Sequence, residues 1–154
     1  MRGLKIVVVL LALLQVSAIL HMPVQAQKSA SDAVRNRITA MSEMGRTLKA
    51  LQQAIRRGGL TEDQSTEVLI ERLRQDTEIL PTLFAVYEKS EASEAREIIW
   101  TEPEAFAEQI AQFATTVESL VSAYETGNNA QTRAAIRDVM VACGDCHQIY
   151  RDTR

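Results

Sequence analysis

Two thiols and an imidazole lie close together near the C-terminal end of the 154-residue chain, in Cys143-Gly-Asp-Cys146-His147. The pattern C-x-x-C-H is the attachment sequence of a c-type haem, whose vinyl groups form thioethers with the two cysteines. The adjacent histidine supplies an axial nitrogen to the iron. On a helix, positions i, i+3 and i+4 share one face, so all three side chains can address one macrocycle from the same side. The sequence therefore predicts one haem c, with its iron, attached covalently through Cys143 and Cys146.

Other chemistry of the same residues fits the sequence less well. A redox-active dithiol accompanies a βαβ pattern and is activated at a helix N-terminus, whereas this motif falls near the end of a predicted helix in a chain without predicted strands. Zinc needs a fourth nitrogen or sulfur ligand, and the chain has no further cysteine. A periplasmic dithiol oxidoreductase is therefore the least favoured of three interpretations, behind the two haem-binding functions described below.

The first 26 residues have the pattern of a secretory signal peptide. Two basic residues precede an apolar run from Ile6 to Leu20, and Val24-Gln25-Ala26 offers a cleavage position. The run is shorter than the ~20 apolar residues that a membrane span needs, which argues against an uncleaved anchor. We expect cleavage after Ala26, no stable membrane insertion of the mature chain, and a periplasmic cytochrome domain over residues 27–154.

Cleavage of the signal peptide would leave few residues that can bind iron, and it would make the chain more acidic. The mature segment keeps His147 as its only histidine and Met41, Met44 and Met140 as its only methionines. Two basic residues leave with the signal peptide, so the formal net charge changes from −3 to about −5. An acidic chain without a basic patch argues against nucleic acid and against an anionic membrane surface as partners.

The mature segment is rich in helix formers, and its first half divides into two predicted helices. These are expected at Asp32–Arg57 and Glu62–Glu88, separated by Gly58-Gly59. Pro81 should kink or split the second helix, because it removes a backbone donor and crowds the preceding turn. Apolar residues recur at bundle-type spacing in the first helix; they are Val34, Met41, Met44, Leu48, Leu51 and Ile55.

The second half holds a long connection and two more predicted helices. A polar connection over Lys89–Ile99 leads to a third helix that opens at Pro103, with Thr101 and Glu104 as a capping box. Gly127 ends this helix, and Asn128 or the next residue caps a fourth helix that runs to about Tyr150. The residues expected to face inward are Phe84, Tyr87, Phe106, Ile110, Phe113, Val117, Leu120, Tyr124, Ile136, Val139, Met140, Cys143 and His147. Short connections favour antiparallel neighbours, so we expect an all-α, up-down-up-down four-helix bundle.

The chain resembles the class II c-type cytochromes, which comprise the cytochromes c′ and their low-spin relatives. The specific part of this resemblance is C-x-x-C-H-x-x-Tyr150-Arg151 at the C-terminal end of a four-helix chain. Leu80-Pro-Thr-Leu-Phe84 and Trp100 ahead of the third helix are weaker matches. The resemblance covers essentially the whole mature segment and implies a four-helix bundle with one haem.

The resemblance also concerns the sixth ligand of the iron. In cytochromes c′ an apolar residue of the first helix blocks the distal face, whereas in the low-spin branch a methionine of that helix binds the iron. The segment Met41-Ser-Glu-Met-Gly45-Arg46 is similar to the low-spin pattern, which makes Met41 the expected sixth ligand. Met44, or no methionine, remains the alternative, because Met41 and Met44 can both face inward as core residues.

Four arginines are further candidates for contacts with the haem. By resemblance, Arg151 would lie beside the proximal imidazole, although a cation near a helix C-terminus is also favourable by itself. Arg46 is a candidate partner for a haem propionate, as are Arg35 and Arg37, because arginine pairs well with carboxylates. A solvent-exposed helix face is the competing interpretation for each of them.

The function expected from these residues is one-electron transfer rather than enzyme catalysis. A six-coordinate iron with His147 and Met41 as axial ligands would need little rearrangement between oxidation states. Its partners would be other redox proteins, met transiently and steered by charge. The alternative is a five-coordinate cytochrome c′ that binds nitric oxide or carbon monoxide. The sequence is compatible with both a monomer and a homodimer.

Overall fold

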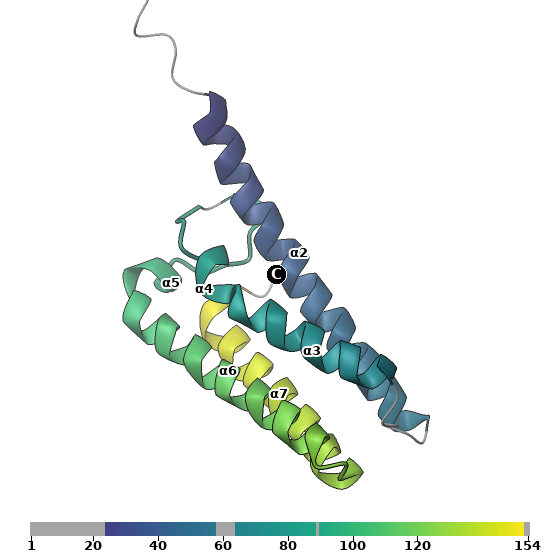
Figure 1. The fold of residues 1–154 in the computed structure, drawn as a ribbon. Coiled ribbons are helices and arrows are strands. Elements are labelled where there is room, and N and C mark those ends of the chain that lie inside the picture. The colour runs from purple at the N-terminus through teal and green to yellow at the C-terminus, as the bar shows by residue number, and fades with distance from the viewer. Residues whose placement is uncertain (1–23, 58–63, 89, 153–154) are drawn as a thin grey trace, which may run out of the picture.

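The computed structural model describes residues 24–57, 64–88 and 90–152. The predicted signal sequence before residue 24 and the Gly58-Gly59 pair lie outside these residues. The helices are α2 (Val24–Arg56), α3 (Gln64–Glu78), α4 (Leu80–Leu83), α5 (Ile98–Thr101), α6 (Pro103–Glu125) and α7 (Asn129–Tyr150). Of these, α2, α3, α6 and α7 form the predicted antiparallel four-helix bundle, and α2 extends beyond it at its N-terminal end (Figure 1).

The first half of the chain differs from the prediction mainly in where its helices begin and end. The first helix begins at Val24 rather than at Asp32, since no glycine or proline interrupts the intervening residues. The predicted break at Pro81 is confirmed, because α3 ends at Glu78 and Pro81 lies in the first turn of the separate helix α4. No helix in the described part of the chain has the length and hydropathy needed to cross a membrane.

The predicted capping box ahead of the third helix is wrong. Thr101 belongs to the short helix α5, where its hydroxyl donates to the carbonyl of Glu97 at 3.5 Å. Glu102 is the N-cap of α6 and makes no side-chain capping bond, while Pro103 occupies the first turn as predicted. The extra turn of helix in front of Pro103 therefore removes Thr101 from the capping position.

Two residues expected to face the core are exposed. Tyr87 lies beyond the end of α4, so the helical spacing that predicted its direction no longer applies, and it is 52% exposed. Met140 is 39% exposed, because its neighbour Val139 takes the inward position on α7. Met140 contacts the amide of Gln52 across the α2–α7 interface.

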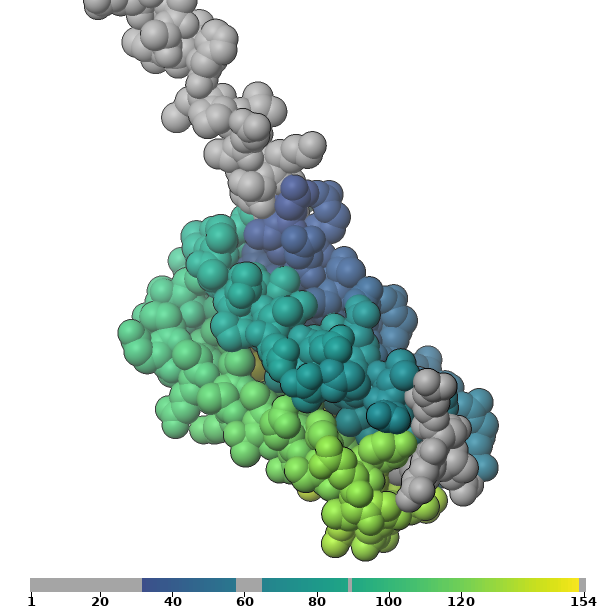
Figure 2. Space-filling view, in the orientation of Figure 1, coloured from purple at the N-terminus to yellow at the C-terminus, as the bar shows by residue number. Residues whose placement is uncertain are grey.

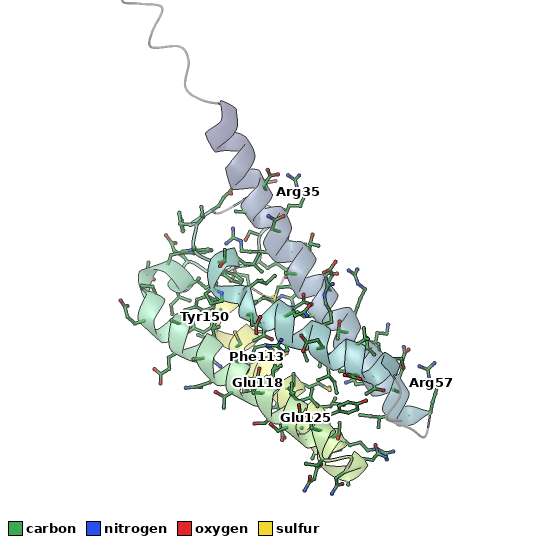
Figure 3. The ribbon with its side chains drawn as sticks, in the orientation of Figure 1. Arg35, Arg57, Phe113, Glu118, Glu125 and Tyr150 are labelled. Carbon is green, nitrogen blue, oxygen red and sulfur yellow. The ribbon has the colours of Figure 1, made fainter. Side chains whose placement is uncertain are left out.

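The bundle is packed most tightly at the end where α6 turns into α7. Leu51, Leu73, Leu120 and Ile136 come one from each long helix, and each is completely buried there or nearly so. The heptad spacing predicted for the first helix is confirmed, since Val34, Met44, Leu48 and Leu51 are buried and Met41 and Ile55 half-buried. In Figure 3, Arg35 and Arg57 point away from the bundle, while Phe113 and Tyr150 lie within it.

The turn between α6 and α7 fixes the start of the motif-bearing helix. Gly127 has a positive φ of 68°, a conformation that costs glycine little. The side chain of Asn128 then accepts hydrogen bonds from the backbone N–H groups of Ala130 and Gln131, at 3.1 and 3.2 Å. Asn128, rather than Asn129, is therefore the N-cap of α7.

We predict that Asn128→Ala lowers the free energy of unfolding by about 0.5–2 kcal/mol, because two N–H groups of α7 lose their acceptor. Asn129→Ala is the matched control, since Asn129 is exposed and lies one position inside the helix. Urea unfolding followed by circular dichroism gives both values. Equal losses in the two variants would contradict the assignment of the cap.

Candidate haem site

A cavity of about 510 Å³ lies at the end of the bundle opposite the tightly packed turn. This volume falls within the ~300–1,000 Å³ that small-molecule and cofactor sites occupy. Its apolar lining comes from α2, α4, α5, α6 and the segments beside them; these residues are Val34, Ile38, Met41, Met44, Leu48, Leu80, Phe84, Ile99, Phe106, Ile110 and Phe113. In the view of Figure 2, α3 and α6 cover most of the C-terminal half of α7.

The three residues of the attachment motif line this cavity together. Cys143, Cys146 and His147 lie on the last turns of α7, and all three are half-buried. The predicted shared helix face is therefore present, and it faces the mainly apolar cavity. Tyr150, on the same face, is buried and packs edge-on against Phe106 with ring centroids 4.9 Å apart.

The thiols of the motif are not activated. Burial raises the pKa of Cys143 to about 11, with a smaller contribution from the charge of Cys146, and burial also raises the pKa of Cys146. A redox-active cysteine needs a lowered pKa, because the thiolate is the nucleophile. The electrostatics of this site therefore count against the dithiol interpretation.

The imidazole of His147 is neutral at physiological pH. Burial lowers its pKa, the charge of Arg151 lowers it further, and Glu94 acts in the opposite direction. A neutral imidazole has a free lone pair, which is the form that binds a metal. Nothing needs to be deprotonated before this side chain can act as a ligand.

Two methionines of α2 line the same cavity. Met41 is half-buried at the edge of the core, whereas Met44 is 5% exposed and belongs to the core itself. Gly45 also borders the cavity, and a Cβ atom at this position would meet no protein atom within 4 Å. Packing between the helices therefore does not require a glycine here.

Arg37 is the arginine that faces the cavity from α2. It is 4% exposed, and its guanidinium lies 5.1 Å from the ring centroid of Trp100 and 5.5 Å from that of Phe84. Nη2 donates to the carbonyl of Glu88 at 3.0 Å, while Nε and Nη1 have no protein partner. Burial lowers the pKa of Arg37, but guanidinium remains protonated. A buried cation with unpaired donors is costly, so this position suits an anionic group.

The other arginines that were candidates for haem contacts differ from Arg37 in exposure and in their ion pairs. Arg46 is exposed, forms ion-pair contact with Glu43 at 3.7 Å, and does not line the cavity. Arg35 is exposed and pairs with Asp32. Arg151 does line the cavity, and its guanidinium forms an ion pair with Glu94 at 2.7 Å.

Sequence reasoning missed Glu94. This residue lies in the polar connection between α4 and α5, and the segment 92–95 lines the cavity beside the motif. No spacing rule links position 94 to position 147. The one indication in the sequence was Arg151 itself, because an arginine near the haem needs an acidic partner.

The residues present fit a haem. The cavity combines an apolar lining, two thiols and a neutral imidazole on one helix, and an arginine with two unpaired buried nitrogens. A haem matches each of these features, because its macrocycle is apolar, its vinyl groups can bond to the thiols, its iron can bind the imidazole and its carboxylates can pair with the arginine. Fold and site together define an α-helical bundle of the c-type cytochrome class.

Comparison with known proteins identifies the family. The description "Cytochrome C′" belongs to the family profile that matches residues 32–151. The chain therefore belongs to the cytochrome c′ family, and it carries covalently bound haem c with iron. Cys143 and Cys146 are the only cysteines that the sequence offers for this attachment.

Two kinds of curated relative are similar in sequence. A cytochrome c-554 of Cereibacter sphaeroides is 38% identical over 74 residues, which cover 48% of this chain and 47% of that protein. A cytochrome c′ of Rubrivivax gelatinosus is 31% identical over 65 residues, which cover 42% of this chain and 50% of that protein. The matches thus span about half the length of these relatives.

Solved structures share the fold. Ferric cytochrome c prime from Alcaligenes xylosoxidans aligns with a TM-score of 0.74 at 22% identity, over 81% of this chain and 97% of that one. Cytochrome c prime from Shewanella frigidimarina gives 0.71 at 17% identity, over 80% and 97%. The four-helix architecture predicted from the sequence is thereby confirmed.

We predict that Cys143 in the haem-free chain reacts slowly with iodoacetamide at neutral pH and faster as the pH rises toward about 11. The raised pKa keeps the sulfur protonated, whereas unfolding restores an ordinary thiol and should accelerate alkylation at pH 8 by about two orders of magnitude. The Cys146→Ser variant isolates the signal of Cys143, and circular dichroism checks that the helices are intact. Rapid alkylation of the native chain at neutral pH would revive the dithiol interpretation.

Proposed function

We propose that the protein is a periplasmic monohaem cytochrome that carries single electrons, with Cys143 and Cys146 as attachment residues and His147 and Met41 as axial ligands. The observation that supports it is the shared cavity: Met41 lines it from α2, and His147 lines it from α7. The haem supplies the one-electron couple. The protein performs no substrate chemistry in this proposal.

The chain's own residues would hold the haem and shield it from water. The last turns of α7 present both thiols and the imidazole on one face, while apolar side chains of α2 and α6 exclude water from the cavity. Burial and a methionine ligand both raise the reduction potential of a haem. We choose Met41 over Met44 because Met44 is already packed within the core, where movement toward a ligand position would disturb its neighbours.

A second candidate function is a five-coordinate cytochrome c′ that binds nitric oxide or carbon monoxide. The family description and the solved structures favour this candidate over the six-coordinate one. One of those structures, with a TM-score of 0.59 at 24% identity, is a nitric oxide complex of an Alcaligenes xylosoxidans cytochrome c prime variant. The position of Met41 in the cavity wall is the feature that favours the electron carrier.

The proposed location and partners follow from the sequence. Residues 1–26 have the pattern of an export signal, and haem attachment at C-x-x-C-H fits the periplasm. The partners are other redox proteins, met transiently. The excess of acidic residues in the chain makes charge steering toward a basic partner surface effective.

We predict that the reduced protein shows sharp, split visible bands that carbon monoxide does not change. Met41→Ala should convert it to a high-spin form that binds carbon monoxide, because the sixth ligand is lost. Met44→Ala is the matched control and should keep the parental spectrum. Broad bands in the parental protein that shift with carbon monoxide would instead select the five-coordinate candidate, and an unchanged Met41→Ala spectrum would reject Met41 as a ligand.

We also propose that Arg37, rather than Arg46, pairs with a haem propionate. Arg37 belongs to the cavity lining and has two buried nitrogens without a hydrogen-bond partner, whereas Arg46 is exposed to solvent. We predict that Arg37→Gln lowers the free energy of unfolding of the haem-bound protein by about 1–3 kcal/mol, the range for hydrogen bonds to charged groups. Arg46→Gln should change it by less than about 0.5 kcal/mol.

Guanidinium unfolding of the haem-bound and haem-free proteins measures both variants. The Arg37→Gln loss should be larger with haem than without it, since the ring contacts of Arg37 exist in both forms. An equal loss in the two forms would assign Arg37 to core packing alone.

A further inference from the structure

The connection between α4 and α5 is joined to the end of the motif helix. We call its residues 93–96 the strap. The backbone N–H of Asp152 donates to the carbonyl of Glu94 at 2.7 Å, and that of Arg96 donates to the carbonyl of Tyr150 at 2.9 Å. Ala95 and Arg151 form an antiparallel bridge between these two bonds. The strap thus runs as a short extended segment beside the residues that follow His147.

The side chain of Arg96 fastens the strap further. Its Nη1 donates to the carbonyls of Gln148 and Ile149 at 3.2 and 2.9 Å, and its Nε donates to Asp152 at 3.1 Å. Carbonyls in the last turn of a helix lack partners within the helix, so Arg96 satisfies two acceptors that α7 leaves open. The position of the strap is therefore coupled to the end of the helix that presents the axial histidine.

Glu94, held in this position by the strap, forms an ion pair with Arg151. Its Oε2 accepts from Nε of Arg151 at 2.7 Å and lies 2.7 Å from Nη2 of the same guanidinium. Both residues line the cavity, together with His147, which lies one helical turn before Arg151. The two charges act on the imidazole in opposite directions.

We propose that Glu94 is a positioning residue that holds Arg151 beside the proximal side of the haem and offsets its charge, and that this ion pair sets the reduction potential from the histidine side. Ferric iron carries one more positive charge than ferrous iron. An unpaired cation nearby therefore favours the reduced form, and an unpaired anion favours the oxidised form. The proposal rests on the haem attachment of the proposed function and is independent of the sixth ligand.

The test is a redox titration, followed by absorption, of the haem-bound protein and its variants. Glu94→Gln leaves the Arg151 charge uncompensated and should raise the potential. Arg151→Gln leaves the Glu94 charge uncompensated and should lower it. The double variant should return toward the parental value, because it removes both charges of one interacting pair. Since both side chains are partly exposed, the single shifts should shrink as ionic strength rises.

Two further variants separate charge from structure. Glu94→Asp keeps the carboxylate and should keep the potential close to parental. Asp138→Asn removes one negative charge from the exposed side of α7, outside the strap and outside the cavity lining, so it should leave the potential almost unchanged. A purely structural role for the pair predicts similar losses of thermal stability in Glu94→Gln and Arg151→Gln, without shifts of opposite sign.

Shifts of opposite sign that cancel in the double variant would support the proposal. Shifts in the same direction, or none, in haem-bound variants would overturn it and leave the proposed function intact. A parental protein without attached haem would overturn both. Because the sign of each shift depends only on charge beside the iron, the outcome is read in the same way for five- and six-coordinate haem.

Discussion

The structure depends on one constraint: four helices must pack tightly at one end and stand apart at the other. At the closed end, fully buried leucine and isoleucine side chains, one from each long helix, fill the space between α2, α3, α6 and α7. At the open end α2, α6 and α7, together with the short helices α4 and α5, border a cavity of about 510 Å³. Protein interiors are otherwise close-packed, so a cavity of this size in a small domain marks the site of a cofactor.

Polar groups around the cavity follow from that constraint. Arg37, on α2, is buried beside two aromatic rings. Its guanidinium donates one hydrogen bond to a carbonyl, while its other two nitrogens have no hydrogen-bond partner. Arg151, at the end of α7, is met by Glu94 from a connection that is far away in sequence. One cation therefore keeps two nitrogens without a hydrogen-bond partner, while the other forms an ion pair within the protein.

Much of the fold could be predicted from the sequence, because helix formers, Pro81, Pro103, Gly127 and Asn128 act locally. Errors arose where tertiary structure overrides a local rule. Thr101 matches a capping box but lies in an additional helical turn, and Tyr87 follows the end of α4, where helical periodicity no longer sets its direction. The motif residues were predictable from spacing, whereas Glu94 was not, since only folding brings residues 94 and 151 together.

The central claim is that the cavity holds a haem fixed by Cys143 and Cys146. The most direct test is the intact mass of the denatured protein, produced with its export signal and haem-attachment machinery. We predict the mass of residues 27–154 plus one haem, retained after denaturation because thioether bonds are covalent, and lost from the double variant Cys143→Ser/Cys146→Ser. A parental mass without haem, with both thiols free, would contradict the account.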